Sequence, residues 1–230
     1  MATMTQLDLA TMTVRELNEH LHQVLPEQPV EQLEIVNPDG LHSIAAGMDH
    51  AIAIGVMGHT GYFTAGMNKL ADVTIHGNAG WSVAENMMSG SVRVKGHASE
   101  CAGASAHGGL LVIEGDASSR CGISLKGADI VVGGNVGHFS AFMAQAGRLV
   151  ICGDAGAHLG DSLYEATIYV RGSIASLGAD AREEPMQAED EEQLGALLEQ
   201  AGMEHDPASF KRIASARQLY HWNADAGQEY

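Results

Sequence analysis

The sequence predicts an all-β solenoid: a right-handed parallel β-helix of about seven 19-residue coils, with short helical N- and C-terminal flanks. A glycine recurs every 19 residues without a slip, two aliphatic columns precede it, and polar and small columns follow it. One such unit cannot close a core alone, so we expect the units to stack. The repeat glycines are Gly58, Gly77, Gly96, Gly115, Gly134, Gly153 and Gly172.

A strand is expected just before each repeat glycine. The residues four and two positions before it, such as Val73 and Ile75, are aliphatic in every repeat, whereas the residues between them follow no single chemistry. Successive side chains of a strand point to opposite faces, so this alternation is typical of a half-buried strand. Stacking would bury the aliphatic columns in one continuous core. We expect a right-handed coil, because the hexapeptide repeats of left-handed β-helices are absent.

Polar and small residues follow each glycine. The next position carries His, Asn, Asp or Ser, which are residue types that hydrogen-bond the backbone at turns. Columns of small residues three and seven positions after the glycine indicate further tight corners, where coils approach closely. The polar column, which we expect to stabilise the turns, comprises His59, Asn78, His97, Asp116, Asn135, Asp154 and Ser173.

Composition and charge restrict the kind of core, the cellular location and the classes of partner that we expect. Of the 230 residues, 45% are hydrophobic and only 5% aromatic, as a thin core of aliphatic residues requires. No apolar run approaches the roughly 18 residues that span a bilayer, and no signal-peptide pattern begins the chain, so we expect a cytoplasmic protein. The net charge of −17 argues against nucleic-acid or anionic membrane partners. Residues 52–179 carry only −2 of it, so the acidity lies in the flanks.

Three parts are expected along the chain: an N-terminal helix and lead-in (1–51), the β-helix (52–179), and an acidic linker with C-terminal helices (180–230). The T-x-x-E pattern of Thr13 and Glu16 predicts a capped helix over 13–25, and a short strand is expected near Leu33. Beyond the linker at 180–192, helices are expected over 189–201 and 207–220, the second with Asp206 as its N-cap. These helices could cover the open end of the prism.

No residue pattern identifies a catalytic, cofactor-binding or metal-binding site. Cys101, Cys121 and Cys152 share no column and form no C-x-x-C pair, which predicts free thiols rather than a cluster or a disulfide. His59 and His97 stand two coils apart, about 10 Å, which is too far to bind one metal ion. Three further histidines stay open as interface or channel-lining residues, namely His107, His138 and His158.

Asp116 and Asp154 raise one catalytic alternative. They are two coils apart in the polar column, a spacing that could place two carboxylates as an inverting glycosidase needs them. Such enzymes need a long cleft lined with aromatic side chains, and only one tryptophan, Trp81, lies within the coils. A β-helix carbohydrate-active enzyme is therefore disfavoured.

The 19-residue coil, the corner glycines and the segment T-V-R-E-L-N-E-H-L (13–21) together resemble the GXGXG domain at the C-terminal end of the glutamate synthase large subunit. The resemblance covers about residues 5–222. As a separate chain, it is similar in particular to the small subunit of split glutamate-synthase-like enzymes. That group includes the second subunit of N-methylglutamate synthase, also described as a glutamate-synthase-like protein of the glx operon.

The resemblance implies a non-catalytic scaffold subunit in methylamine metabolism. The implied partners are a class II glutamine amidotransferase-like subunit and an FMN-binding glutamate synthase-like subunit, which would hold the FMN and the iron–sulfur cluster. This chain would hold no cofactor, and a hetero-oligomer is expected. Tyr220 and Trp222 are candidate anchors at a partner interface, because aromatic side chains are enriched there. The β-helical subunit of formylmethanofuran dehydrogenase, also a structural module, stays open as an alternative.

Overall fold

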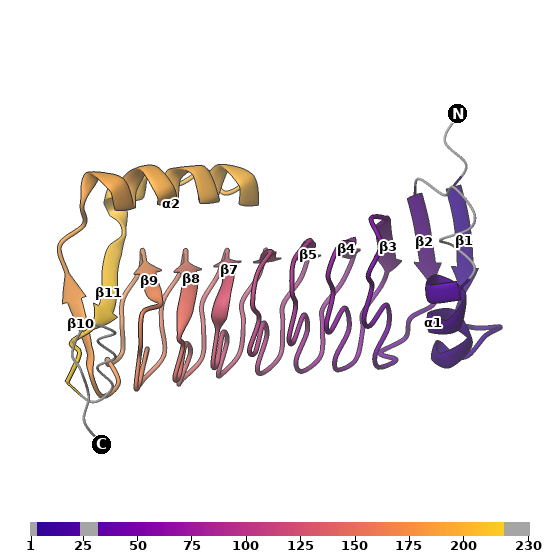
Figure 1. Ribbon diagram of the computed structural model, residues 1–230, viewed down its shortest axis with the longest axis horizontal. Helices are drawn as coiled ribbons and strands as arrows, with labels where there is room; N and C mark the ends of the chain where they lie inside the picture. The colour runs from indigo at the N-terminus through magenta and orange to yellow at the C-terminus, as the bar shows by residue number, and fades with distance from the viewer. Residues whose placement is uncertain (1–3, 24–31, 219–230) are drawn as a thin grey trace, which may run out of the picture.

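The computed structural model describes residues 4–23 and 32–218 and confirms a parallel β-solenoid. Its strands are β1 (Met4–Asp8), β2 (Gln32–Val36), β3 (Ala53–Met57), β4 (Asp72–Ile75), β5 (Ser91–Val94), β6 (Leu110–Ile113), β7 (Lys126–Val132), β8 (Ala146–Ile151), β9 (Thr167–Val170), β10 (Ala181–Glu184) and β11 (Lys211–Ser215). Its helices are α1 (Val14–Gln23) and α2 (Ala188–Ala201). Figure 1 shows the coils stacked along one axis, with α1 at the N-terminal end and α2 above the C-terminal half.

All strands belong to one sheet, in the order β1 to β9 followed by β11 and β10. The parallel register from β3 to β9 follows the repeat, so that Val73 pairs with Ile54 on one side and with Val92 on the other. The side chains of these three residues are buried, as the alternation predicts. Strands β1 and β2 extend the same sheet toward the N-terminus: β2 confirms the short strand expected near Leu33, whereas β1 has no counterpart among the expected elements.

Each coil returns to the next strand through a segment whose alternate residues have positive φ. In the coil of Gly77 these are Ser82, Ala84 and Asn86, with φ between 54° and 59°. The Ser82 N–H donates to the carbonyl of Glu100 in the next coil, and the Ala84 N–H donates to the carbonyl of Thr64 in the preceding coil. The small column seven residues after each glycine is thus the buried centre of this segment. We call this surface, formed by residues 61–71, 80–90, 99–109, 118–125, 137–145 and 156–166, the turn face.

The N-terminal end of the core is covered by α1. The predicted capping box is confirmed, because the Thr13 N–H donates to Oε2 of Glu16 at 2.8 Å and the Glu16 N–H donates to Oγ1 of Thr13 at 3.2 Å. Leu17 and Leu21 are fully buried against the main core. The expected helix over 13–25 therefore forms, as far as the described residues extend.

The C-terminal end differs from the expectation. The predicted helix over 207–220 is wrong: Asp206 does cap a turn, but only the 3-10 turn Pro207–Ser209, and strand β11 follows. Strand β11 pairs antiparallel with β9 and with β10, so the sheet edge that β9 would leave open is paired. Tertiary pairing overrides the local helix signal here. Strand β10 likewise lies inside the segment that was expected to be a linker.

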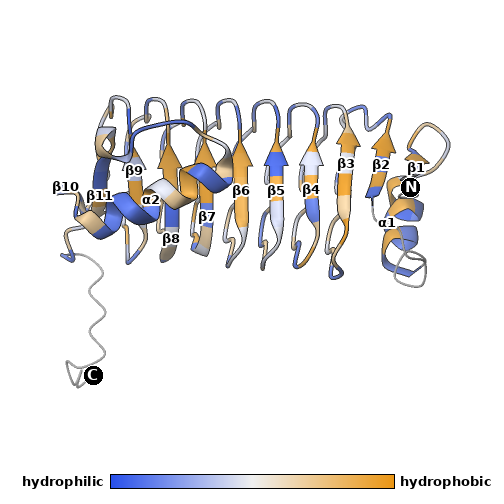
Figure 2. Cartoon of the chain, turned by 90° about the horizontal axis from the view of Figure 1, so that it is seen from above, coloured by the Kyte–Doolittle hydropathy of each residue, from blue (hydrophilic) through white to orange (hydrophobic). Residues whose placement is uncertain are grey.

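The expected helix over 189–201 is confirmed as α2, but it does not cover the end of the prism. It lies across the outer face of the sheet over β7 to β9, with its C-terminal end near β6 (Figure 2). Neither described helix is long and apolar enough to cross a membrane. The division at residues 51 and 179 stays a prediction, although one sheet crosses both positions.

Candidate functional surfaces

The polar column forms a hydrogen-bond ladder along one corner of the solenoid. Each side chain accepts the backbone N–H of the residue one coil further on: Nδ1 of His97 accepts from Asp116 at 2.9 Å, and Oδ1 of Asp116 accepts from Asn135 at 2.7 Å. The same bond recurs at every step from His59 to Ser173. These residues therefore stabilise the corner, as expected from their types.

The repeat glycines make room for this ladder. A Cβ at Gly134 would lie 2.2 Å from Oδ1 of Asp116, and a Cβ at Gly115 would lie 2.7 Å from Nδ1 of His97. Among the seven, only Gly58 has a positive φ. Close approach between coils, rather than a left-handed backbone, is thus the reason that glycine occupies this column.

The ladder also accounts for the carboxylates that suggested a glycosidase. Asp116 and Asp154 each accept a backbone N–H from the following coil. Hydrogen bonds from the backbone and hydroxyl of Ser173 hold the pKa of Asp154 below its usual range, so this carboxylate stays ionised near neutrality. Neither residue lies in a described aromatic cleft, and their role in the structure is to bond the corner.

The three histidines that the sequence left open are surface residues. His107, His138 and His158 are all exposed on the turn face, where the His158 ring stacks on Phe139 with ring centroids 4.7 Å apart. Their exposure is compatible with the prediction that they lie at an interface, which stays a prediction. The coil interior beneath them is filled by buried aliphatic side chains.

The three cysteines are free, as predicted. Burial raises the pKa of the Cys121 thiol to about 12 and that of the Cys152 thiol to about 11, so both stay protonated and unreactive. Among residues 4–23 and 32–218, no group of three or more His, Cys, Asp and Glu side chains is arranged to hold a metal ion.

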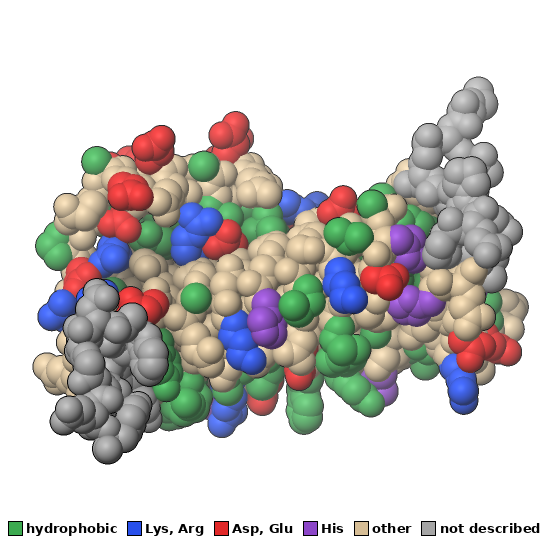
Figure 3. All heavy atoms as spheres, in the orientation of Figure 1, with side chains coloured by type: hydrophobic (Ala, Val, Ile, Leu, Met, Phe, Trp, Pro, Cys, Tyr) green, Lys and Arg blue, Asp and Glu red, His purple; other side chains and the backbone are tan. Residues whose placement is uncertain are grey.

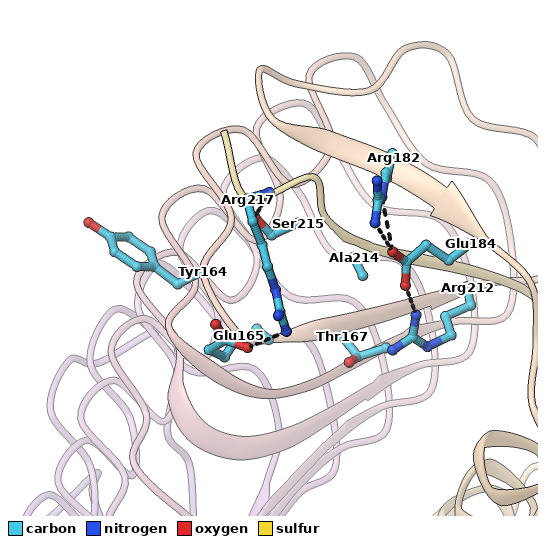
Figure 4. Close-up of a pocket in the computed structure, with 10 residues that line it drawn as sticks. Tyr164, Glu165, Thr167, Arg182, Glu184, Arg212, Ala214, Ser215 and Arg217 are labelled. Carbon is cyan, nitrogen blue, oxygen red and sulfur yellow. Dashed lines mark hydrogen bonds and ion pairs between the residues drawn. The ribbon is translucent and has the colours of Figure 1, made fainter. Parts of the chain in front are cut away.

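A polar cavity of about 300 Å³ lies at the C-terminal end, between the last coil and the antiparallel pair of β10 and β11. Figure 4 shows Arg182 and Arg212 converging on Glu184, while Arg217 reaches Glu165. Arg182 donates to Oε1 of Glu184 at 2.6 Å, and Arg217 lies 3.3 Å from Glu165. Each of these arginines is thus paired with a carboxylate, and the cluster joins the β10–β11 pair to the last coil rather than leaving a free cationic site.

The same charge network anchors α2. Oδ1 of Asp190 accepts from the Tyr169 hydroxyl at 2.8 Å and from Nε of Arg212 at 3.0 Å. Burial alone would raise the pKa of Asp190, but its hydrogen bonds from the Gln187 backbone, Tyr169 and Arg212 bring that pKa below its usual range. The Arg93 guanidinium donates to the Ala201 carbonyl at 3.0 Å, at the other end of the helix.

The outer face of the sheet falls into two halves. Under α2, the outward side chains Val112, Val131, Val150 and Tyr169 are buried and form a second core with Leu194, Leu197 and Leu198. Over β3 to β5, the outward residues Gly55, Thr74 and Arg93 are only half-buried. A shallow hollow of about 220 Å³ lies over this open half, lined in part by Gly55, Thr74 and His76.

Sequence reasoning missed this second core. The signal is present in the outward column, where three successive coils carry valine, although the column as a whole follows no single chemistry. The candidate anchors Tyr220 and Trp222 lie outside the described residues, and their contact with a partner stays a prediction.

Comparison with known proteins supplies a relative. Protein GlxC of Rhizobium meliloti (strain 1021) is 52% identical to this chain over 228 residues, which cover 99% of this chain and 100% of that protein. This supports the expected resemblance to a glx protein. No family model matches the chain, and membership in the GXGXG domain family stays a prediction. With half of its residues identical along its whole length, the chain belongs to the GlxC family.

Proposed function

We propose that this chain is the non-catalytic scaffold subunit of a glutamate-synthase-like enzyme, most specifically of N-methylglutamate synthase, which joins methylamine to glutamate. The observation that carries the proposal is the full-length relationship to Protein GlxC at 52% identity. It agrees with the resemblance of the repeat to the GXGXG domain of glutamate synthase.

The partners in this proposal divide the chemistry between them. A class II glutamine amidotransferase-like subunit releases ammonia, and an FMN-binding glutamate synthase-like subunit with an iron–sulfur cluster carries out the synthase half-reaction. The candidate catalytic groups of this chain have other uses: Asp116 and Asp154 accept backbone hydrogen bonds, and the Cys121 and Cys152 thiols are buried. A subunit of this kind contributes shape rather than reacting groups.

A solenoid suits a scaffold because its geometry is fixed coil by coil. Inter-coil hydrogen bonds run along the strands, along the polar ladder and along the turn face. Nine parallel strands spaced about 4.8 Å apart give a body roughly 40 Å long. Two enzymes bound to such a body would be held at a constant separation, and the path between their sites could be walled by it.

Co-purification tests the proposal. The tagged full chain, expressed in its native host and purified under native conditions, should bring with it a glutaminase-like protein and a flavoprotein, identified by mass spectrometry, with FMN and iron in the eluate. The same chain purified from a host that lacks these partners should be colourless and inactive in glutamine hydrolysis and in amine–glutamate ligation. Stoichiometric flavin or iron in that isolated chain would contradict the scaffold role. Molybdenum or tungsten subunits in the native eluate would favour the dehydrogenase alternative instead.

A further inference from the structure

The turn face concentrates the exposed apolar side chains of the molecule. Six of the eight Phe, Tyr and Trp residues among those described belong to it, and the other two, Tyr169 and Phe210, pack in the core under α2. Five of the seven exposed large hydrophobic side chains in residues 4–23 and 32–218 also lie there: Tyr62, Met67, Leu70, Trp81 and Met88, with Trp81 the most exposed at 63%. Figure 3 shows hydrophobic side chains gathered along the lower edge of the molecule, away from α2.

The charge of this face sets it apart from the rest of the chain. The turn face carries two basic and four acidic side chains, whereas the whole chain has a net charge of −17. A nearly neutral surface with protruding aromatic side chains is typical of a protein–protein interface. The order of the charged side chains along the turn face indicates which partner binds it.

The charged side chains of the turn face are complementary to those of a second copy when the order of its coils is reversed. Numbered from the coil of Gly58 to that of Gly153, coil one carries Lys69, coil two Glu85, coil three Glu100 and coil four Arg120, with the exposed Lys126 directly after coil four in the column of Lys69. Coil five carries no charge, and coil six carries Asp161 and Glu165. Reversing the order places base against acid in coils one and six and again in coils three and four.

We propose that the turn face binds a second copy of this chain, with the two solenoids antiparallel. The two-fold axis lies in the interface, perpendicular to the solenoid, and passes between coils three and four. Such an axis keeps each column opposite the same column of the partner. It therefore brings Glu100 of one copy within one column of Arg120 of the other. Lys69 comes equally close to Glu165, which is 59% exposed beside Arg217 of its own chain. This inference goes beyond the proposed function and does not depend on it.

The apolar side chains fit the same arrangement. Trp81 in coil two faces coil five, where His138 holds the same column and the neighbouring Phe139 forms an edge-to-face pair with Phe142, with ring centroids 6.0 Å apart. Together with Arg120, these two phenylalanines line a shallow groove of about 130 Å³. An indole inserted there would contact two aromatic rings and a guanidinium, which are favourable neighbours for tryptophan.

A parallel arrangement is disfavoured by the same charges. It would place each coil opposite its own copy, so that the coil of Glu100 faces the coil of Glu100, and coil six, with Asp161 and Glu165, faces the same two carboxylates. Like charges in contact across an interface are repulsive. Helix α2, whose five acidic side chains belong to the C-terminal flank, lies on the opposite side of the molecule (Figure 1).

Charge reversal combined with analytical ultracentrifugation tests the interface. The full chain should sediment as a dimer whose dissociation on dilution gives a Kd. Glu100→Arg or Arg120→Glu alone should each raise this Kd at least about tenfold, and the double variant should restore it. Within one chain these two groups are 3.9 Å apart and more than 40% exposed, so the melting temperature should change little.

Trp81→Ala gives a second readout that does not involve charge. It should also raise the Kd at least about tenfold, whereas Met57→Ala, which removes a side chain 40% exposed outside the turn face, should leave it unchanged. A chain that is monomeric at every concentration would overturn the proposal. So would a dimer that is insensitive to Trp81→Ala, or a double reversal that dissociates further than either single one. None of these results bears on whether enzyme partners co-purify.

Discussion

The outer face of the sheet is closed over β6 to β9 and open over β3 to β5, although the inner face is the same in both halves. Inward residues are aliphatic and buried from Ile54 to Ile168. Outward residues are half-buried at Gly55 and Thr74 but completely buried at Val131 and Val150, where α2 packs on them. The repeat therefore specifies the core, whereas the burial of the outward residue in each coil depends on whether α2 covers that coil.

The largest contrast between the halves is expected from an acidic substitution at the outward position. Val150→Asp places a carboxylate beneath Leu194 and Leu197, where the described structure offers it no partner, and should lower the free energy of unfolding by more than about 3 kcal/mol. Thr74→Asp is the matched control in the open half. It lies in register with Arg93 on the next strand, and should change the stability by less than about 0.5 kcal/mol. Chemical denaturation of both variants measures the difference.

Equal destabilisation by the two substitutions would show that the open half is covered in solution. That result would remove the distinction between the halves, and it would point to a partner or a segment of this chain resting on β3 to β5.

The corners, in contrast, should respond alike in both halves. A Cβ at Gly77 would lie 2.6 Å from the backbone of Gly58, and a Cβ at Gly134 would lie 2.2 Å from Asp116 and 3.0 Å from the backbone of Gly115. Substitution of either glycine by valine should cost more than about 2 kcal/mol, since the approaching atoms belong to the adjacent coil. Gly115→Val should behave in the same way.

Lys95→Ala is the control for these variants. Its ammonium group is 2.6 Å from Glu114, but the side chain is 43% exposed, so its loss should cost under about 0.5 kcal/mol. Similar melting temperatures for Lys95→Ala and Gly134→Val would contradict the close packing of the corner.

Much of this architecture follows from one period in the sequence. The interval of 19 residues predicts the register of β3 to β9, because stacking identical units is the way to bury both aliphatic columns, and the pairing of Ile54 with Val73 confirms it. The types in the polar column predict turn bonding. The ladder itself could be inferred only in part, since the acceptor and the N–H that it receives belong to different coils.

Other features have no local signature. Phe63 and Met67 adopt positive φ, which their side chains disfavour, and inter-coil hydrogen bonds from their N–H groups to Trp81 and Glu85 hold them there. Asp206 and Pro207 form a helix-start pattern and predict a helix where strand β11 forms. Pairing with the edge of β9 decided its conformation, and an edge is a property of the fold rather than of the segment.

The smallest expected effect concerns the acid dependence of the closed half. Asp190 joins α2 to the sheet through Tyr169 and Arg212, and its pKa lies below the usual 3.8 in the folded chain. A carboxylate with a lowered folded-state pKa stabilises the protein above its unfolded value and loses that contribution as the pH falls through the folded value. The contribution is therefore complete at pH 7 and declines below about pH 4.

Asp190→Asn isolates this contribution. At neutral pH the variant should be less stable than the parent by about 1 to 2 kcal/mol, because the amide replaces a charged acceptor of three hydrogen bonds. The gap should shrink as the pH is lowered below 4, where the parent carboxylate takes up a proton. Hydrogen exchange should locate the loss in α2 and in the outward residues beneath it, with β3 to β5 unchanged. A gap that stays constant with pH, or loss of protection spread evenly over both halves, would mean that Asp190 is not what fastens the helix to the closed half.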